Sequence, residues 1–479
     1  MRIAFLQDNG INESLSLTDI AGLLHSRGHE CELFIERNEK DFFGGVAAFR
    51  PDLVVLPLDI WGEKVALGIA AQVNRLLSVP TVVCGTFPLL YPEIIEHPEI
   101  NIVSLGESEF PILDLVEHLR DGENFTSIPN LIVKENGRVH RNELRPLIQD
   151  LTVLPLPRRE IYYKYSFMRN LSLKRFTSGR GCPNACGFCY NAEFKKIYRG
   201  KGKYLRRKPV ERTIEEIDCM KREFPLGSVH FSDDLFTADH GWVMEFSEEY
   251  GKRFSNIPFT CNTTVNMVSD DMLKAMKKAG CHGLAIGMET GREWLRIKEL
   301  NKPFTDEEIY RTASLIKKNG LGLTLFTMLG LPKETVDDMF ATIRMCRKIN
   351  AHNVRATLFS PIPKTRMTER AVKEGILKAS YDDQSEAGKL LTPVFNYAHR
   401  RETENLFYLF EVALRSPLLE RIVRFIIRFP LPPIIKLSLL PRLYREKKFF
   451  NITLWSGFVF FLKTTFPQNR TKNYNNYLP

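Results

Sequence analysis

Short apolar runs alternate with helical patterns along the first 120 residues. The runs RIAFL, DLVVLP, TVVC and IVSL predict strands, and the nearly continuous apolar runs DLVVLP and TVVC are typical of strands buried on both faces of a parallel sheet. Segments with apolar residues three and four positions apart lie between these runs, and the first, Leu15 to Arg27, ends at Gly28. With a further strand at Glu32 to Phe34, the pattern predicts a doubly wound, flavodoxin-like (Rossmann-type) sheet in an α/β protein.

The alternation is interrupted and then resumes. Two short strand patterns flank Glu135-Asn136-Gly137, which predicts a hairpin, and the proline-rich run LTVLPLPRRE follows. After Leu171 six further β/α units predict a partial, TIM-like (β/α)6 barrel, whose chemistry belongs at the carboxyl ends of the strands. We therefore expect a doubly wound domain over residues 1–127, a linker over 128–165, a barrel over 166–395 and a helical C-terminal region over 396–479.

Composition and charge narrow the class of protein. Hydrophobic residues at 44% and charged residues at 26% are close to globular averages, and no apolar run reaches the roughly 18 residues of a membrane span. Nine cysteines, with no signal-sequence pattern after Met1, favour a reducing, cytoplasmic location. Almost all of the net charge of +10 falls in residues 400–479, where 14 Lys and Arg stand against 5 Asp and Glu. We therefore expect no nucleic-acid partner and place any anionic partner at the C-terminal end.

Three of the nine cysteines lie within eight residues, in the segment SGRGCPNACGFCYNAEF. Cys182, Cys186 and Cys189 have C-x3-C-x2-C spacing, which chance rarely produces and which therefore predicts a metal or redox site. Zinc is the weaker alternative, because no His or fourth Cys lies nearby in sequence to close a four-ligand site. Three thiolates can hold an iron–sulfur cluster that leaves one iron open for a ligand. The isolated cysteines are expected to be buried apolar residues.

This spacing, with the aromatic Phe188 before the third cysteine, resembles the signature of the radical S-adenosylmethionine (radical SAM) superfamily. The segments RRKPVERTIEEIDCMKREF, VHFSDDLFT, GLAIGMETG, MLGLPKET and FSPIPKTRM resemble further strand motifs of its cobalamin-dependent branch. The resemblance implies a 4Fe-4S cluster on the three cysteines that chelates and reductively cleaves S-adenosylmethionine. It also implies an S-adenosylmethionine site made by Phe188, Ser232, Asp233, Asp234, Asn262 and Glu289. The simpler alternatives are helix N-caps for Asp233 and Asp234 and a surface turn for Glu289.

The N-terminal region resembles the cobalamin-binding domain that precedes the barrel in this branch. Loops at the ligand edge of its sheet would form the cobalamin site, with Asp8, Asn9, Gly10, Leu58, Asp59, Gly85, Thr86, Gly106 and Glu107. The loop after the first strand reads QDNGIN and lacks the histidine of the D-x-H-x-x-G motif that supplies a lower axial ligand. We therefore expect cobalamin without a protein imidazole ligand, and the alternative is a degenerate domain kept for packing.

The resemblance implies an enzyme that methylates an unactivated carbon of a small molecule. A cobalamin-linked cyclase or rearrangement enzyme is the nearest alternative, and a non-catalytic cobalamin or redox sensor is the alternative from another class. A methylthiotransferase would need a second three-cysteine cluster, which Cys31 and Cys84 cannot form. No electron-donor domain is visible in the sequence, so a separate flavodoxin or ferredoxin is expected to supply electrons.

The region from Glu402 to Phe466 is apolar, aromatic and basic. Apolar residues recur there mostly at three- and four-residue steps, namely Phe407, Phe410, Leu414, Leu418, Ile422, Phe425, Ile426 and Phe429, and REKK precedes FFNITLWSGFVFFL. This pattern predicts amphipathic helices. They would either cap the barrel mouth or make peripheral contact with the inner face of an anionic membrane, which would suit an apolar or lipid-like substrate.

Overall fold

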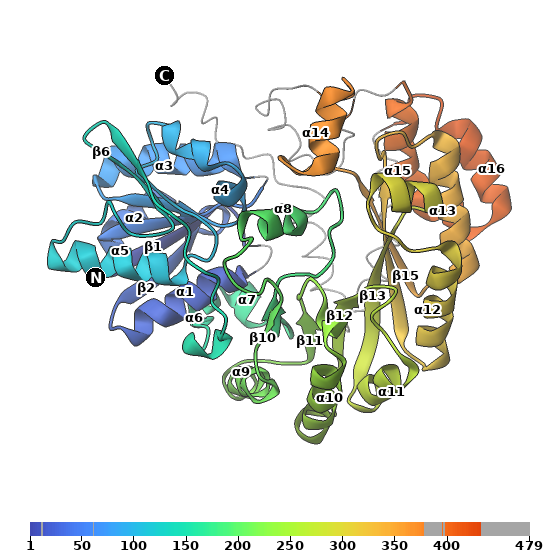
Figure 1. The fold of residues 1–479 in the computed structure, drawn as a ribbon, viewed down its shortest axis with the longest axis horizontal. Helices are drawn as coiled ribbons and strands as arrows, with labels where there is room; N and C mark the ends of the chain where they lie inside the picture. The colour runs from blue at the N-terminus through green and yellow to red at the C-terminus, as the bar shows by residue number, and fades with distance from the viewer. Residues whose placement is uncertain (11–12, 61, 378–394, 396–397, 433–479) are drawn as a thin grey trace. The chain divides into compact units, whose positions relative to one another are not determined.

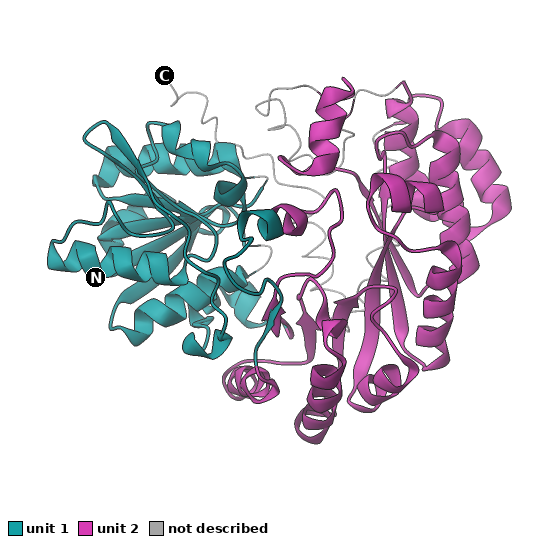
Figure 2. Cartoon of the chain, viewed as in Figure 1, with its two compact units in different colours: residues 1–171, 194–208, 463–479 teal, residues 172–193, 209–462 magenta. Residues whose placement is uncertain are grey.

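The structure is a computed structural model that describes residues 1–10, 13–60, 62–377, 395 and 398–432. Among these residues the chain forms two compact units (Figure 2). The first unit contains residues 1–171 and 194–208, and the second contains residues 172–193 and 209–432.

The first unit is built on one seven-stranded sheet with the order β2-β1-β3-β4-β5-β6-β7. Its parallel strands are β1 (Arg2–Gln7), β2 (Glu30–Ile35), β3 (Leu53–Pro57), β4 (Thr81–Cys84) and β5 (Ile102–Ser104). The helices that connect them are α1 (Leu15–Ser26), α2 (Phe42–Phe49), α3 (Glu63–Leu77) and α4 (Thr86–Leu90), and α5 (Glu109–Asp121) follows β5. The five parallel strands have the flavodoxin order 2-1-3-4-5, which confirms the predicted doubly wound sheet.

The first part of the segment that we expected to be a linker, residues 128–165, belongs to this sheet. Strands β6 (Leu131–Glu135) and β7 (Arg138–Arg141) form the predicted hairpin, and β6 pairs antiparallel with β5. The turn holds Asn136 and Gly137 at φ 48° and 74°, the left-handed conformation that two-residue hairpin turns require. The short helices α6 (Glu160–Tyr163) and α7 (Ser166–Arg169) follow, and the Tyr162 hydroxyl donates to Gln7 Oε1 at the end of β1 (2.7 Å).

The second unit is a half-barrel of six parallel strands in the order β15-β14-β13-β12-β11-β8 (Figure 1). The strands are β8 (Leu173–Phe176), β11 (Ser228–Phe231), β12 (Phe259–Thr263), β13 (Cys281–Glu289), β14 (Gly322–Leu329) and β15 (Asn353–Leu358). Its helices are α9 (Val210–Glu223), α10 (His240–Phe254), α11 (Asp270–Lys278), α12 (Asp306–Lys318), α13 (Val336–Ile349) and α14 (Arg366–Lys373). Consecutive strands are neighbours in this sheet, so the partial barrel is confirmed.

Aromatic side chains join the half-barrel sheet to α10. Phe231 on β11, Phe259 on β12 and Phe246 on α10 are fully buried. The Phe231 and Phe246 rings meet edge to face with centroids 5.2 Å apart. Contacts of this kind contribute about 0.5–1.5 kcal/mol each beyond the area they bury. Phe231 is the last residue of β11, so this cluster packs directly before Ser232 and Asp233 in the chain.

Two C-terminal helices pack on the outside of α13. Helix α15 (Arg400–Arg415) is held there by Arg347, whose guanidinium donates to Ala413 O (2.6 Å) and Leu414 O (3.1 Å). Arg347 also forms an ion pair with Glu420 of α16 (Pro417–Ile426) at 2.8 Å. No helix in the described part of the chain is long and apolar enough to cross a membrane. The REKK and FFNITLWSGFVFFL segments lie outside the described residues.

Candidate active site

The cysteine loop runs from β9 (Gly179–Arg180) to α8 (Tyr190–Ile197). Cys182, Cys186 and Cys189 are partly exposed, and none is in a disulfide. Burial raises the pKa of Cys189 to about 12. Burial also raises the pKa of Cys186, and the ammonium of Lys302 opposes that shift. Among the described residues, no three His, Cys, Asp or Glu side chains converge on one point as a single metal ion requires. The loop therefore offers three thiols that are not in disulfides, without a preformed site for a single metal ion.

Backbone and side-chain hydrogen bonds fix the middle of this loop. The Gly187 N–H donates to Leu300 O (2.8 Å), and Gly187 O accepts from the Met367 N–H (2.9 Å). The Asn301 side chain donates to Ala185 O (2.6 Å). The Phe188 ring packs against an apolar cluster that includes Leu300 and Met367. The loop conformation is therefore set by segments more than 100 residues downstream.

The carboxyl end of β11 holds three of the predicted site residues. Asp233 is buried and accepts hydrogen bonds from the Ser178 backbone N–H (3.0 Å) and hydroxyl (2.7 Å). Asp234 accepts from the Tyr190 hydroxyl (3.2 Å), which joins it to the cysteine loop. Neither aspartate caps α10, because Asp239 is its N-cap. The alternative reading of Asp233 and Asp234 as N-caps is therefore wrong, and Asp233 ties the end of β8 to the end of β11.

Two further polar groups lie at these strand ends. The Ser232 hydroxyl is buried and has no hydrogen-bond partner among the described residues. The Asn262 side chain at the end of β12 donates to Asp233 O (3.1 Å). The structure therefore brings Ser232, Asp233, Asp234 and Asn262 together next to the loop that carries Cys189. A buried hydroxyl without a partner is suited to a polar ligand.

Glu289, at the end of β13, is part of a buried ion pair. Its Oε1 lies 2.7 Å from Lys302 Nζ, and each side chain is only 10% exposed. Glu289 has φ 66°, a left-handed conformation that is uncommon for a residue with a side chain, and a β-bulge separates it from Gly287. A Cβ at Gly287 would collide with Glu289 Oε1 and Lys302 Nζ, so this glycine makes room for the pair. Glu289 is therefore not a surface turn acid.

Lys302 connects this pair to the cysteines electrostatically. Burial acts to lower its pKa, but Glu289 and the thiols of Cys186 and Cys189 outweigh burial, so the pKa of Lys302 lies above its ordinary value. The sequence analysis did not find Lys302, since it follows an irregular segment without a recognisable pattern. The Asn-Lys-Pro stretch after the β13 loop is the one local signal near it.

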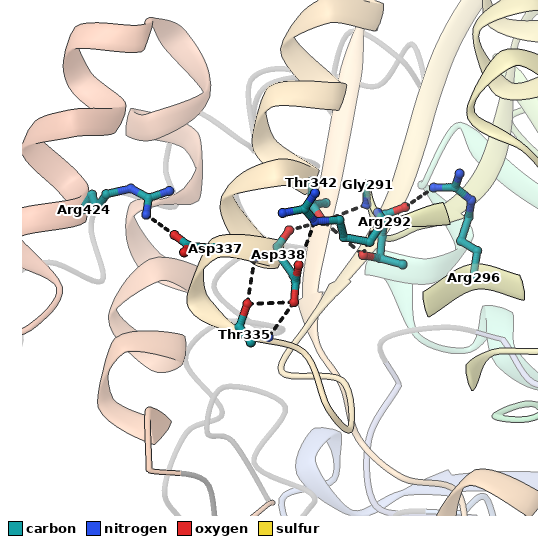
Figure 3. A network of polar contacts seen from close by, with 9 residues as sticks. Gly291, Arg292, Arg296, Thr335, Asp337, Asp338, Thr342 and Arg424 are labelled. Carbon is teal, nitrogen blue, oxygen red and sulfur yellow. Dashed lines mark hydrogen bonds and ion pairs between the residues drawn. The ribbon is translucent and has the colours of Figure 1, made fainter. Parts of the chain in front are cut away.

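A polar network fixes the turn that follows Glu289 (Figure 3). The Gly291 N–H donates to the Thr342 hydroxyl (2.8 Å), and Arg292 Nε donates to Asp338 Oδ1 (2.7 Å). The fully buried Arg296 donates to Thr290 O (2.6 Å). A Cβ at Gly291 would lie 2.6 Å from Ala341 O, so only glycine allows this close approach to α13. The β13 turn is thereby held rigidly to α13.

The loop after β14 closes around a buried carboxyl group. One Glu334 oxygen accepts from the Gly330 N–H (2.7 Å) and the Leu331 N–H (3.0 Å). Glu334 is 1% exposed, and burial raises its pKa to about 8. The carboxyl group is therefore protonated at neutral pH. Sequence analysis placed the MLGLPKET motif at a strand end but did not single out this residue.

The nine predicted cobalamin residues lie at the carboxyl ends of four neighbouring strands of the first sheet. They follow β1 (Asp8, Asn9, Gly10), β3 (Leu58, Asp59), β4 (Gly85, Thr86) and β5 (Gly106, Glu107). Desolvation raises the pKa of Asp59, and the carboxylate of Asp8 adds to the shift, so the ends of β1 and β3 are close together. This is the point at which the strand order reverses, where doubly wound sheets bind ligands.

Backbone geometry shapes the rest of this edge. Gly85 has φ 112°, and a Cβ there would lie 2.8 Å from Leu58 O. Gly106 has φ 73° and packs against the Tyr198 hydroxyl. Glu107 accepts from the Ile148 N–H (2.7 Å) and forms an ion pair with Arg206 (2.8 Å). Glu107 therefore ties the end of β5 to the segments around Ile148 and Arg206.

Comparison with known proteins identifies the class. Residues 176–346 match the family model described as the Radical SAM superfamily. The match runs from the last residue of β8 into the last turn of α13. This segment, which carries the three cysteines of the loop, is a radical SAM domain.

Its relatives include enzymes with different reactions. The chain is 29% identical over 340 residues to the uncharacterized methyltransferase PH0819 of Pyrococcus horikoshii. The aligned region covers 69% of this chain and 72% of that protein. It is 26% identical over 365 residues to the anaerobic magnesium-protoporphyrin IX monomethyl ester cyclase of Rubrivivax gelatinosus. That aligned region covers 72% of this chain and 63% of the cyclase. The chain therefore spans less than two thirds of the cyclase.

A solved structure shares the fold of both units. The radical S-adenosylmethionine methyltransferase TsrM from Kitasatospora setae, with cobalamin and a 4Fe-4S cluster bound, superposes with a TM-score of 0.67. The match covers 79% of each chain at 17% identity. At this identity the likeness concerns the fold alone.

Proposed function

We propose that this protein is a cobalamin-dependent radical SAM methyltransferase that acts on an unactivated carbon of a small molecule. The observation that carries the proposal is the loop of Cys182, Cys186 and Cys189 beside the polar groups at the end of β11. Three cysteine thiols on one loop fit a cluster with one open iron. The similarity to PH0819 and the fold shared with TsrM support methyl transfer and cobalamin.

In this proposal the residues have distinct tasks. Cys182, Cys186 and Cys189 hold a 4Fe-4S cluster, and the β1, β3, β4 and β5 edge of the first sheet holds cobalamin. When bound, these groups and S-adenosylmethionine supply radical generation and a methyl group for transfer. Ser232 and Asp234 bind S-adenosylmethionine through the unpartnered hydroxyl and the carboxylate next to the loop. Asn262 and Asp233 fix the position of these groups.

The Glu289–Lys302 ion pair and an electron donor complete the proposal. Glu289 and Lys302 keep a compensated charge pair near the cysteines, so that neither is left as an isolated buried charge. An external one-electron donor, a flavodoxin or ferredoxin, supplies the electron. A cyclase reaction is the second candidate, because the cyclase of Rubrivivax gelatinosus matches 72% of the chain.

Iron loading tests the cluster. Anaerobic reconstitution of the full chain should give about four iron atoms per protein. Replacing Cys182, Cys186 and Cys189 together by Ala should abolish both the iron and the formation of 5′-deoxyadenosine. Cys219→Ala is the matched control, because Cys219 is a partly exposed cysteine on α9. Zinc in anaerobically purified protein, without iron, would contradict the proposal.

Cobalamin and the reaction type need separate measurements. Full chain mixed with hydroxocobalamin and desalted should retain corrin absorbance in an approximately equal amount to protein. The reconstituted enzyme is added to extracts of a strain that lacks it, together with S-adenosylmethionine labelled in its methyl group. A product that carries the label should then form. An unlabelled, oxidised product would favour the cyclase reaction. Normal 5′-deoxyadenosine formation without corrin retention would leave a radical SAM enzyme whose first domain serves packing.

A further inference from the structure

Helix α16 presents a row of apolar side chains to solvent. Leu418 is 67% exposed, Ile422 45%, Phe425 62% and Phe429, just beyond the helix, 50%. Steps of four, three and four residues place these side chains on one side of a helix. The described residues include nine exposed large hydrophobic side chains, and four of the nine belong to this row. Single exposed apolar residues need no explanation, but a continuous row of this kind marks an interaction surface.

The opposite side of α16 is anchored to the half-barrel unit. Glu420 forms ion pairs with Arg344 and Arg347, each at 2.8 Å. Arg424 pairs with Asp337 at the start of α13 (Figure 3). The Arg424 guanidinium also lies over the Phe340 ring, 4.2 Å from its centroid.

The carboxyl end of the helix is held as well. The Asn405 side chain of α15 donates to Ile427 O (2.8 Å) and Phe429 O (2.9 Å). Contacts on the opposite side of α16 therefore fix the direction in which the apolar row points. It is a fixed feature of the fold.

The charges beside the row are all positive. Arg415, Arg421 and Arg428 are exposed, and no described carboxylate pairs with them. The one acidic residue of α16, Glu420, is turned inward toward Arg344 and Arg347. The sequence that follows, residues 433–479, contains eight Lys and Arg and a single Glu. The three exposed arginines beside the row therefore complement an anionic partner.

We propose that this α16 face, made of Leu418, Ile422, Phe425, Phe429 and the three flanking arginines, docks the enzyme on an anionic lipid bilayer. The apolar row enters the boundary between headgroups and acyl chains, and the arginines contact the lipid phosphates. A second copy of the chain is a poorer occupant, because a two-fold contact would bring two sets of three arginines together without a carboxylate. The inference does not depend on the reaction type proposed above.

Vesicle binding by the full chain tests this docking face. Wild-type protein should sediment with phosphatidylglycerol-containing vesicles at low salt, release at high salt and ignore pure phosphatidylcholine vesicles. The triple variant Leu418→Gln, Phe425→Gln and Phe429→Gln should bind about tenfold more weakly, since most of the buried apolar area is lost. The double variant Arg421→Gln and Arg428→Gln should lose most of the preference for phosphatidylglycerol.

Matched controls separate docking from misfolding. The double variant Leu76→Gln and Val153→Gln removes two apolar side chains that are each 52% exposed elsewhere, and it should bind vesicles as wild type does. All variants should still form 5′-deoxyadenosine, so loss of vesicle binding is distinguishable from failure of the proposed reaction. Sedimentation of the triple variant at the wild-type level would overturn the proposal. A loss of self-association by light scattering, without a change in vesicle binding, would overturn it in favour of a second copy.

Discussion

The two main sheets of this protein differ in the groups that form the edge at the carboxyl ends of their parallel strands. In the half-barrel, the edge is supported by buried ionisable groups, namely the Glu289–Lys302 pair, the Glu334 carboxyl group and the His230 imidazole. In the first sheet, the edge is shaped by backbone at Gly85 and Gly106, with the partly solvated carboxylates Asp8 and Asp59.

The difference matches two kinds of chemistry. Fixed charges and dipoles in a dry site stabilise groups whose charge changes during a reaction. A large cofactor is instead held mainly by a surface of complementary shape, with few polar contacts. The comparison therefore predicts that substitutions at the half-barrel edge cost far more stability than substitutions at the first edge.

The largest effect should come from breaking the buried ion pair. Lys302→Met would leave Glu289 as an unpaired buried charge, which costs about 3–5 kcal/mol of unfolding free energy. Denaturant unfolding of the full chain measures this loss. Lys333→Met is the matched control, because Lys333 is 39% exposed and pairs at 3.6 Å with Glu299, so its loss should cost less than about 1 kcal/mol. Equal costs for the two lysines would break the comparison.

The second effect is a dependence of stability on pH. Because burial raises the pKa of Glu334 to about 8, the folded protein keeps a proton that the unfolded chain releases above its ordinary value of 4.5. Stability should therefore fall as pH rises, by about 2 kcal/mol between about pH 6.5 and about pH 8. Glu334→Gln keeps a side-chain oxygen for the Gly330 and Leu331 N–H groups but cannot ionise, so the slope in this range should flatten.

His230 does not interfere in this range. Burial lowers its pKa to about 3, so its contribution to stability is lost as pH falls below the ordinary value of 6.5. Chemical unfolding of wild type and Glu334→Gln at both ends of the range measures the difference between their slopes. Identical slopes would show that Glu334 titrates in the folded protein as it does in the unfolded chain.

A smaller effect is expected at the first edge. Gly85→Ala would force a side chain into a left-handed conformation against Leu58 O, at a cost of about 1–3 kcal/mol. Corrin retention should drop with it, whereas iron content should stay at the wild-type level. Gly137→Ala is the control: it has φ 74° in the β6–β7 turn, but no atom lies within 4 Å of the added carbon. A loss of iron in Gly85→Ala would contradict the separation of the two edges.

The smallest effect has the opposite sign. Since desolvation and Asp8 raise the pKa of Asp59, its charge opposes folding at neutral pH. Asp59→Asn should stabilise the protein by a few tenths of a kcal/mol, because the exposed side chain is screened by solvent. Glu289→Gln should destabilise it, since Lys302 would lose its partner. Thermal unfolding of both variants at neutral pH gives the sign of each change in stability relative to wild type. Destabilisation by Asp59→Asn would contradict this account.

Local pattern was sufficient for the strands and for the cysteines. Continuous apolar runs marked β1, β3, β4 and β5, and the spacing of Cys182, Cys186 and Cys189 marked the loop. Both signals lie within a few residues, so they need no knowledge of the fold.

The partners of these residues could not be predicted in the same way. Ser178 meets Asp233 across 55 residues, and Lys302 meets Glu289 through an irregular loop after a β-bulge. Such contacts depend on strand order and on a left-handed backbone at Glu289, neither of which has a local signature. The pattern also ended the first domain too early in one respect: it recognised the β6–β7 hairpin but not that β6 pairs with β5.

That hairpin has a consequence for how the chain avoids self-assembly. Without β6, the backbone N–H and C=O groups of β5 would form an open template onto which another chain could add a strand. The hairpin moves the outer strand to β7, a four-residue segment that contains Arg138, His140 and Arg141. A short strand rich in cations is a poor template, since a second copy would align like charges. A fragment cut at residue 127 should therefore aggregate during synthesis, while one that continues through the hairpin should remain dispersed.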